Sequence, residues 1–132
     1  MSSSIEDCIF CNKKNCKVIA STKHFFTIRD TVYPVTKHHT LIITNRHVED
    51  FFDLTKNEMS DLDKVLKEQK KELKRLDEEI SGFNVGVNIG KDAGQSIMHC
   101  HVHLIPRRKG DVKDPRGGVR GVIPKKQKYK RK

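Results

Sequence analysis

The sequence has no apolar run long enough to cross a membrane, and hydrophobic residues make up only 35% of its 132 residues. Its first residues, MSSSIEDCIFC, lack the basic and then apolar arrangement of a secretory signal peptide. We therefore expect one small cytoplasmic domain. Only four cysteines occur, and in a reducing compartment their spacing indicates metal binding or free thiols rather than disulfides: Cys8, Cys11, Cys16 and Cys100.

Acidic residues are also scarce, with 17 against 27 lysines and arginines, so the formal net charge is +10. The last eight residues, KKQKYKRK, hold six basic residues and account for +6, which leaves +4 for residues 1–124. A block of like charges predicts a solvated, disordered tail over residues 125–132. The alternative is nonspecific attraction to nucleic acid, for which Tyr129 is the single aromatic residue of the block.

Short segments rich in β-branched and aromatic residues predict strands at 17–21, 24–30, 39–45 and 83–90. HTLIITN (39–45) is nearly continuous in apolar residues, as expected for a central strand. Between these segments, Thr55 and Glu58 fit a capping box, and apolar residues then recur at steps of three and four. This predicts one amphipathic helix at about 56–79. The order of strands around one helix indicates an α+β fold with an antiparallel sheet.

The stretch SIMHCHVHLIPRR (96–108) places histidines at every second position, His99, His101 and His103. Because alternate residues of a strand share a face, we expect three imidazoles on one side and Cys100, Val102 and Leu104 in the core on the other. Pro106 is expected to end this strand. Three uses are open for such a face: a zinc site, nucleophilic catalysis by a neutral imidazole, or structural hydrogen bonding.

The loop before the histidines, NIGKDAGQS, favours a chemical use. Its glycines allow main-chain N–H groups to approach an anion closely, and Gln95 and Ser96 add side-chain donors. A phosphate held there would lie against the histidines.

Together, Gly94-Gln95-Ser96 and His99-Cys100-His101-Val102-His103-Leu104-Ile105 resemble the signature of the histidine triad (HIT) superfamily of nucleotide hydrolases and transferases. CIFC, FFTIRDTVYPVTKHHTLIITNRHVEDFFDLT and GFNVGVNIGKDAGQS also resemble small bacterial-type members. The resemblance covers about residues 5–108, so we expect a HIT domain over 1–108 with an N-terminal zinc knuckle. Residues 109–124 would wrap over the surface, ahead of the basic tail.

The resemblance implies a role for each matching residue. His101 would attack the α-phosphate of a purine nucleotide conjugate to form a covalent nucleotidyl-histidine, which water then hydrolyses. The catalytic set would be His101, His103 and Ser96. The substrate-binding set would be Asp30, Asn88, Gly94, Gln95, Ser96 and His103, with Phe10, Ile28 and Ile43 as candidate walls of an adenine slot. Dinucleoside polyphosphates and nucleoside phosphoramidates are both open as substrates.

The resemblance also implies a structural zinc ion, held by Cys8, Cys11, His47 and His99, and no catalytic metal. It further implies a homodimer whose two sheets join and whose C-terminal segments reach toward the partner's site. Arg107, Arg116 and Arg120 would then contact polyphosphate oxygens. The competing hypothesis is a nonenzymatic, zinc-stabilised module that binds nucleotide, or binds nucleic acid through the basic tail. No membrane partner is expected.

Overall fold

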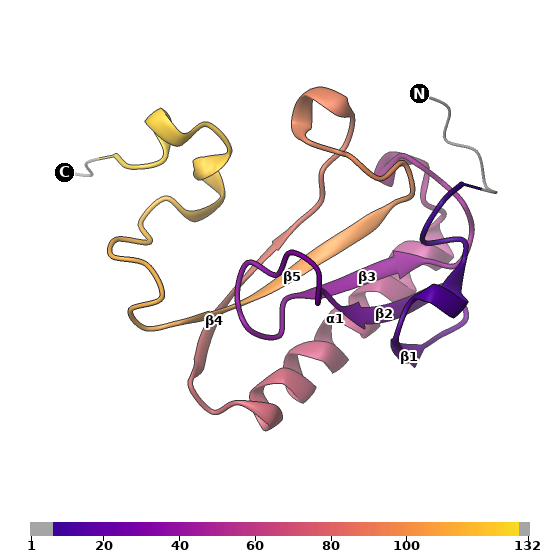
Figure 1. Ribbon diagram of the computed structural model, residues 1–132, viewed down its shortest axis with the longest axis horizontal. Helices are drawn as coiled ribbons and strands as arrows, with labels where there is room; N and C mark the ends of the chain where they lie inside the picture. Colours follow the sequence, from indigo (N-terminus) through magenta and orange to yellow (C-terminus); the bar gives the residue numbers. More distant parts are fainter. Residues whose placement is uncertain (1–6, 130–132) are drawn as a thin grey trace.

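The computed structural model describes residues 7–129, in which five antiparallel strands form one sheet and α1 (Lys56–Leu76) covers one of its faces (Figure 1). Along the sheet the strands lie in the order β1-β2-β3-β5-β4. The predicted α+β fold is therefore confirmed. The strands are β1 (Val18–Ser21), β2 (Phe25–Arg29), β3 (Thr40–Thr44), β4 (Ile80–Gly86) and β5 (His101–Arg108).

α1 begins at the predicted capping box. The hydroxyl of Thr55 accepts the main-chain N–H of Glu58 at 3.1 Å, and the Glu58 carboxylate accepts the main-chain N–H of Thr55 at 2.9 Å. The helix ends at Leu76, three residues before the predicted end at 79. The reason is local: Asp77 takes an extended conformation, and its carboxylate accepts a hydrogen bond from Arg108 of β5 at 2.9 Å.

The two faces of the sheet differ in what they carry. In β5, Val102 and Leu104 point toward α1, whereas His101 and His103 point to the opposite side, which we call the histidine face. The β3–β5 register pairs Ile43 with His101 and places hydrophobic residues of β3 beside both histidines. The predicted alternation of core and histidine residues along β5 is thus confirmed for residues 101–104.

Each face has its own hydrophobic cluster. Between α1 and the sheet, buried residues of both layers pack together: Phe25, Ile42, Leu62, Val65 and Val102. On the histidine face a second cluster joins the N-terminal segment to β2 and β3: Cys8, Phe10, Phe26, Leu41 and Ile43. Every residue of β3 is buried, as predicted for a central strand.

Two predicted strand boundaries are wrong. β4 occupies residues 80–86 instead of 83–90, and β5 continues through Pro106 to Arg108 instead of ending at the proline. The β3 ladder stops at Leu104, so at Pro106 the strand is paired only with β4. The Pro106 carbonyl accepts a hydrogen bond from the Thr36 hydroxyl on the unpaired side at 2.9 Å, and no main-chain donor is needed there.

The chain after β5 forms two short 3-10 helices, η4 (Gly118–Val122) and η5 (Pro124–Lys126), which lie to one side of the sheet in Figure 1. The Arg120 guanidinium donates to the main-chain oxygens of Lys126 and Gln127 at 2.8 and 3.2 Å. Residues 125–129, predicted within a disordered tail, are therefore folded against η4, while residues 130–132 lie outside the described residues. No helix between residues 7 and 129 is both long and apolar enough to span a bilayer.

Candidate active site and metal site

His101 is held at the start of β5 by the chain itself. Its Nδ1 lies 2.7 Å from the main-chain oxygen of His99, and because a carbonyl only accepts, Nδ1 carries the proton. Burial lowers the pKa of His101, so the neutral ring is favoured near pH 7. In the neutral ring Nε2 then carries a lone pair, which is the requirement for a nitrogen nucleophile.

His103 follows on the same face, with its ring centroid 5.3 Å from that of His101. Burial, followed by the neighbouring His101 and His39, lowers the pKa of His103 to about 4. Its Nδ1 lies 2.9 Å from Nε2 of His39, a buried residue directly before the first residue of β3. No local sequence pattern predicts a role for His39, because only the β3–β5 pairing brings residues 39 and 103 together.

Asp30 directly follows β2 and lies on the same side as these imidazoles. Its Oδ1 accepts the main-chain N–H groups of Val32 and Tyr33, both at 3.0 Å, and its Oδ2 lies 4.0 Å from Nδ1 of His39. One carboxylate oxygen therefore fixes the following turn. The other remains available to accept from a hydroxyl group.

The loop between β4 and β5 is built around two glycines with positive φ, Gly90 at 89° and Gly94 at 96°, a region that favours glycine. Gln95 is buried and holds the loop: its amide oxygen accepts from Gly90 N at 2.9 Å. Its amide nitrogen donates to the main-chain oxygens of Glu49 at 2.9 Å and Ile97 at 3.3 Å. These bonds hold the loop through the Gln95 side chain, and the substrate contact that the HIT resemblance implies for Gln95 stays a prediction.

The other predicted loop residues are placed where a ligand could reach them. Ser96 is exposed, and Asn88 is half-buried beside Gly94. Of the candidate adenine walls, Phe10 and Ile43 are buried in the histidine-face cluster and Ile28 is partly buried against it.

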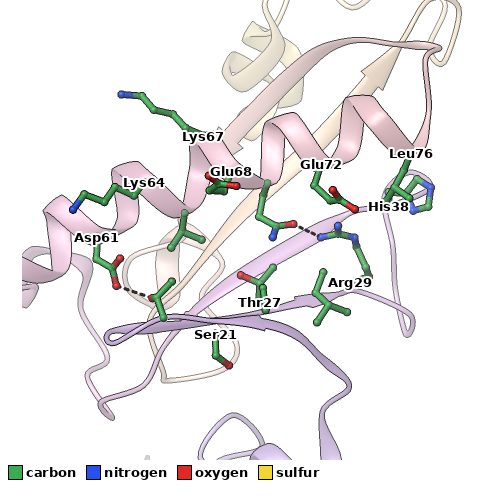
Figure 2. Close-up of a pocket in the computed structure, with 15 residues that line it drawn as sticks. Ser21, Thr27, Arg29, His38, Asp61, Lys64, Lys67, Glu68, Glu72 and Leu76 are labelled. Atoms are coloured by element: carbon green, nitrogen blue, oxygen red, sulfur yellow. Dashed lines mark hydrogen bonds between the residues drawn. The ribbon is translucent and has the colours of Figure 1, made fainter.

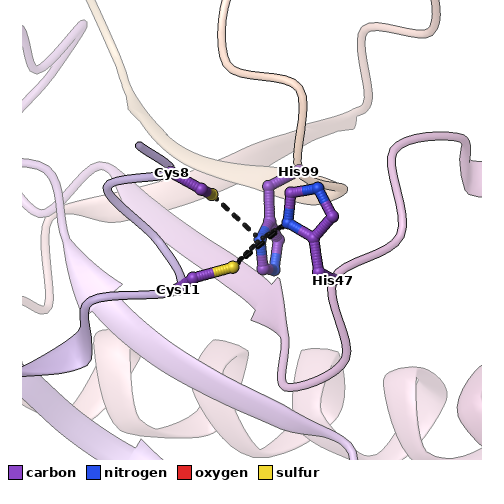
Figure 3. Close-up of side chains that lie close together, drawn as sticks. All are labelled: Cys8, Cys11, His47 and His99. Atoms are coloured by element: carbon purple, nitrogen blue, oxygen red, sulfur yellow. Dashed lines mark hydrogen bonds between the residues drawn. The ribbon is translucent and has the colours of Figure 1, made fainter. Parts of the chain in front are cut away.

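The four predicted metal ligands meet at the other end of the histidine face (Figure 3). Cys8 Sγ lies 3.3 Å from Nδ1 of His99, and Cys11 Sγ lies 3.1 Å from Nδ1 of His47. The two Nδ1 atoms are 3.2 Å apart. All four donor atoms lie within 4.8 Å of one another. His99 therefore belongs to this cluster and lies directly before β5, and the four residues that the HIT resemblance implied as metal ligands are brought together.

The donor set fits zinc. With bonds of about 2.0–2.1 Å to nitrogen and 2.3 Å to sulfur, a tetrahedral ion places its ligand atoms roughly 3.3–3.8 Å apart, close to the separations here. Nε2 of His99 lies 2.8 Å from the Thr44 carbonyl and must donate to it, which turns the Nδ1 lone pair toward the cluster. Burial and the adjacent Cys8 raise the pKa of Cys11, so two thiolates here require a compensating cation.

The three arginines proposed as polyphosphate contacts are engaged elsewhere. Arg107 pairs with Asp111 at 2.8 Å and donates to Asn84 at 2.7 Å. Arg116 pairs with Asp114, and Arg120 holds η5 as described above.

A groove of about 1030 Å³ lies on the opposite face, between α1 and β1–β2 (Figure 2). Its floor holds Arg29, which donates to Gln69 at 2.7 Å and to Thr40 at 3.0 Å. Gln69, which interrupts the apolar repeat of the helix in the sequence, is thus a buried partner of β2. None of the candidate catalytic residues lines this groove.

Comparison with protein families matches residues 12–110 to the HIT domain. An uncharacterized HIT-like protein of Methanocaldococcus jannaschii is 35% identical over 108 residues, covering 79% of this chain and 81% of its own length. A bis(5'-nucleosyl)-tetraphosphatase (asymmetrical) of Schizosaccharomyces pombe is 36% identical over 81 residues, covering 61% of this chain. That match spans 44% of the yeast protein, less than half of its length.

Among solved structures, a zinc-bound histidine triad family protein from Mycobacterium smegmatis superposes with a TM-score of 0.73. It is 28% identical, and the match covers 84% of this chain and 82% of that protein.

Proposed function

Because this chain belongs to the HIT domain family, we propose that it is an enzyme that hydrolyses purine nucleotide conjugates at the α-phosphate. The conjugates would be dinucleoside polyphosphates or nucleoside phosphoramidates. The likeness to the bis(5'-nucleosyl)-tetraphosphatase of S. pombe supports a nucleotide as the substrate.

One observation carries the proposal: the His99 carbonyl binds Nδ1–H of His101 and leaves the lone pair on Nε2. In the first step this lone pair attacks the α-phosphorus. A nitrogen–phosphorus bond forms, and the bond to the leaving group breaks with its electron pair. In the second step water attacks the same phosphorus, the nitrogen–phosphorus bond breaks and a nucleoside monophosphate leaves. The water proton passes to solvent, and His101 is regenerated neutral.

The surrounding groups bind and orient the nucleotide. The side chains of Ser96 and Asn88, on either side of the turn at Gly94, would donate to phosphate oxygens and stabilise the charge that develops in the transition state. His103 would donate to the same oxygens. The free carboxylate oxygen of Asp30 would accept from ribose hydroxyls, and the partly buried Ile28 would contact the base.

The zinc ion would be structural, because four protein ligands close its coordination sphere. It would connect the N-terminal segment and the residues after β3 to His99, and thereby fix the carbonyl that orients His101. No chemical step requires the ion itself.

A turnover panel tests the proposal. Wild-type protein is incubated with an adenosine phosphoramidate and with diadenosine polyphosphates, and nucleoside monophosphate is measured. A substrate radiolabelled at the α-phosphate and rapidly quenched should leave label on wild-type protein. His101→Asn should abolish both signals while nucleotide binding persists, and His24→Asn serves as the matched control. Full turnover by His101→Asn would overturn the proposed mechanism.

The nonenzymatic alternative is favoured only by the six basic residues of 125–132. It requires binding of single-stranded RNA that disappears when these residues are deleted, together with no turnover of any nucleotide in the panel.

A further inference from the structure

His39 is placed to control a neighbouring imidazole. It is almost completely buried, with 2% of its surface exposed, and both of its ring nitrogens have hydrogen-bond partners. The main-chain N–H of Val35 donates to Nδ1 at 3.0 Å, and Nε2 lies 2.9 Å from Nδ1 of His103. The turn that presents Val35 is closed by a hydrogen bond from His39 N to Thr36 O at 3.1 Å.

These contacts fix where the protons are. A main-chain N–H can only donate, so Nδ1 of His39 carries no proton, and the proton of the neutral ring is on Nε2. That N–H donates to Nδ1 of His103, which must accept. The proton of neutral His103 is therefore on Nε2, the nitrogen turned away from His39. Burial lowers the pKa of His39 and of His103, which favours the neutral form of both rings.

We propose that His39 is a positioning residue that holds His103 in the tautomer with Nε2–H, so that His103 donates to the substrate phosphate. The inference rests on the proposed function for its consequence, although the tautomer itself does not depend on any reaction.

The neighbouring histidine shows why this assignment matters. His101 has its proton on Nδ1, because the His99 carbonyl accepts it, and presents a lone pair on Nε2. His103, two residues later on the same face, presents an N–H from the same ring atom. The two rings look equivalent in the sequence, but a main-chain oxygen and a buried histidine give them opposite tautomers. Nucleophile and donor are distinguished in this way.

The direction of the hydrogen bond between His39 and His103 can be tested with two variants of His39, one that can still donate and one that can only accept. Glutamine at position 39 can still donate an amide N–H to Nδ1 of His103. A glutamate carboxylate at the same position can only accept, so it would draw the His103 proton to Nδ1 and leave a lone pair facing the phosphate. His24→Glu introduces the same side chain at another histidine that lies outside the histidine face, and is the matched control.

The direct measurement is the pair of ring ¹⁵N chemical shifts of His103, from long-range ¹H–¹⁵N correlation spectra of the zinc-loaded protein. Wild type and His39→Gln should show Nε2–H, and His39→Glu should show Nδ1–H. Turnover should fall by about 10²-fold or more in kcat for His39→Glu, with His39→Gln and His24→Glu close to wild type. Zinc content and melting temperature verify that each variant is folded.

The spectra decide the inference separately from the proposed function. If wild-type His103 carries its proton on Nδ1, or if His39→Gln changes the tautomer, the inference is wrong even when turnover is high. If His39→Glu inverts the tautomer with no loss of kcat, His39 does not position a catalytic donor. If wild type turns over no nucleotide but shows Nε2–H, the proposed function fails while the assigned tautomer stands.

Discussion

Phe10 packs edge-on against the ring of His101, with the two centroids 5.1 Å apart and the planes at 67°. Phe10 is also 5.9 Å from the ring of His99. Because Phe10 lies between Cys8 and Cys11 in the chain, the segment that carries two candidate metal ligands also packs against the candidate nucleophile. One buried aromatic side chain thus contacts a histidine of the candidate metal site and a histidine of the candidate catalytic site.

Cys8→Ser should lose both metal and stability. The four ligands bind zinc only when the N-terminal segment folds onto the sheet, so the free energy of metal binding is part of the free energy of folding. We expect about one zinc per wild-type chain by elemental analysis, and a lower melting temperature for the variant. Cys16→Ser, at a cysteine outside the cluster, should retain both. Metal-free wild-type protein with an unchanged melting temperature would contradict a structural zinc ion.

Phe10→Leu should keep the metal and lose part of the turnover. Leucine preserves most of the apolar burial, but the aromatic contact with His101 disappears. Such contacts contribute about 0.5–1.5 kcal/mol, so kcat should fall roughly two- to tenfold. Steady-state kinetics and zinc analysis of the same preparation test this. An unchanged kcat would show that the ring does not help to orient the nucleophile.

His38→Gly should stabilise the protein. His38 has φ of 69°, the only positive value for a non-glycine residue in the described part of the chain. This conformation costs an L residue about 1–2 kcal/mol, partly offset by the greater entropy of an unfolded glycine. Chemical denaturation should show a gain of roughly 0.5–1 kcal/mol. Lys37→Gly, at the preceding exposed position, should give no gain, and an equal gain there would refute the explanation.

Glu58→Gln should weaken the protein more at neutral pH than in acid. The Glu58 side chain is 4% exposed, and its carboxylate lies 2.8 Å from the Arg46 guanidinium. The hydrogen bond from Arg46 lowers the pKa of Glu58, and the hydrogen bonds with Thr55 lower it further. A lowered folded-state pKa stabilises the protein above about pH 4.5, and that contribution is lost as pH falls through the folded pKa.

Urea unfolding at pH 7, 5 and 3 measures this effect. The loss caused by Glu58→Gln should be about 1–3 kcal/mol at pH 7 and should be smaller at pH 3. Glu68→Gln, an exposed position of the same helix, should change little at any pH. A loss that is the same at all three values would exclude the ionised carboxylate as its source.

The protein should form a dimer through β4, which is an edge strand of the five-stranded sheet. Val85 of β4 is 48% exposed, so an apolar side chain lies open at this edge. Sedimentation equilibrium at micromolar concentration should give about twice the chain mass of 15.2 kDa. Val85→Lys should shift the protein toward monomer, whereas Val32→Lys, in the connection between β2 and β3, should not. A monomeric wild type would contradict this interface.

Much of the fold could be predicted because its signals are local. The capping box at Thr55 and the alternation around Val102 depend on residues close in sequence, and both are present in the structure. The positions that were misjudged depend on distant neighbours. Pro106 is tolerated within β5 because the β3 ladder has already ended.

In the candidate site, too, local features could be predicted and contacts between distant residues could not. The sequence pattern left three uses open for the histidine face. The resemblance to the HIT superfamily supplied the role of His101 and also four ligands that the structure brings together. The sequence pattern could not reveal the contact of His39 with His103, because the two residues are 64 positions apart. The resemblance to the HIT superfamily implied a place beside the substrate for Gln95. Its burial, and its bonds to three main-chain groups, could be seen only in the folded loop.

The position of β5 has a consequence for how the chain acquires activity. β5 is the last strand to be synthesised but lies between β3 and β4, and its pairing joins Ile43 to His101 across α1. While the chain emerges from the ribosome, β1 to β3 can pair as hairpins, but the edge of β3 stays open until residues 101–104 of β5 are available. Pairing over such a separation is slow compared with local hairpin and helix formation. Both the candidate nucleophile and one of the four candidate metal ligands, His99, are therefore brought into place in the closing step of folding, and regain of turnover after dilution from denaturant reports when the sheet is complete.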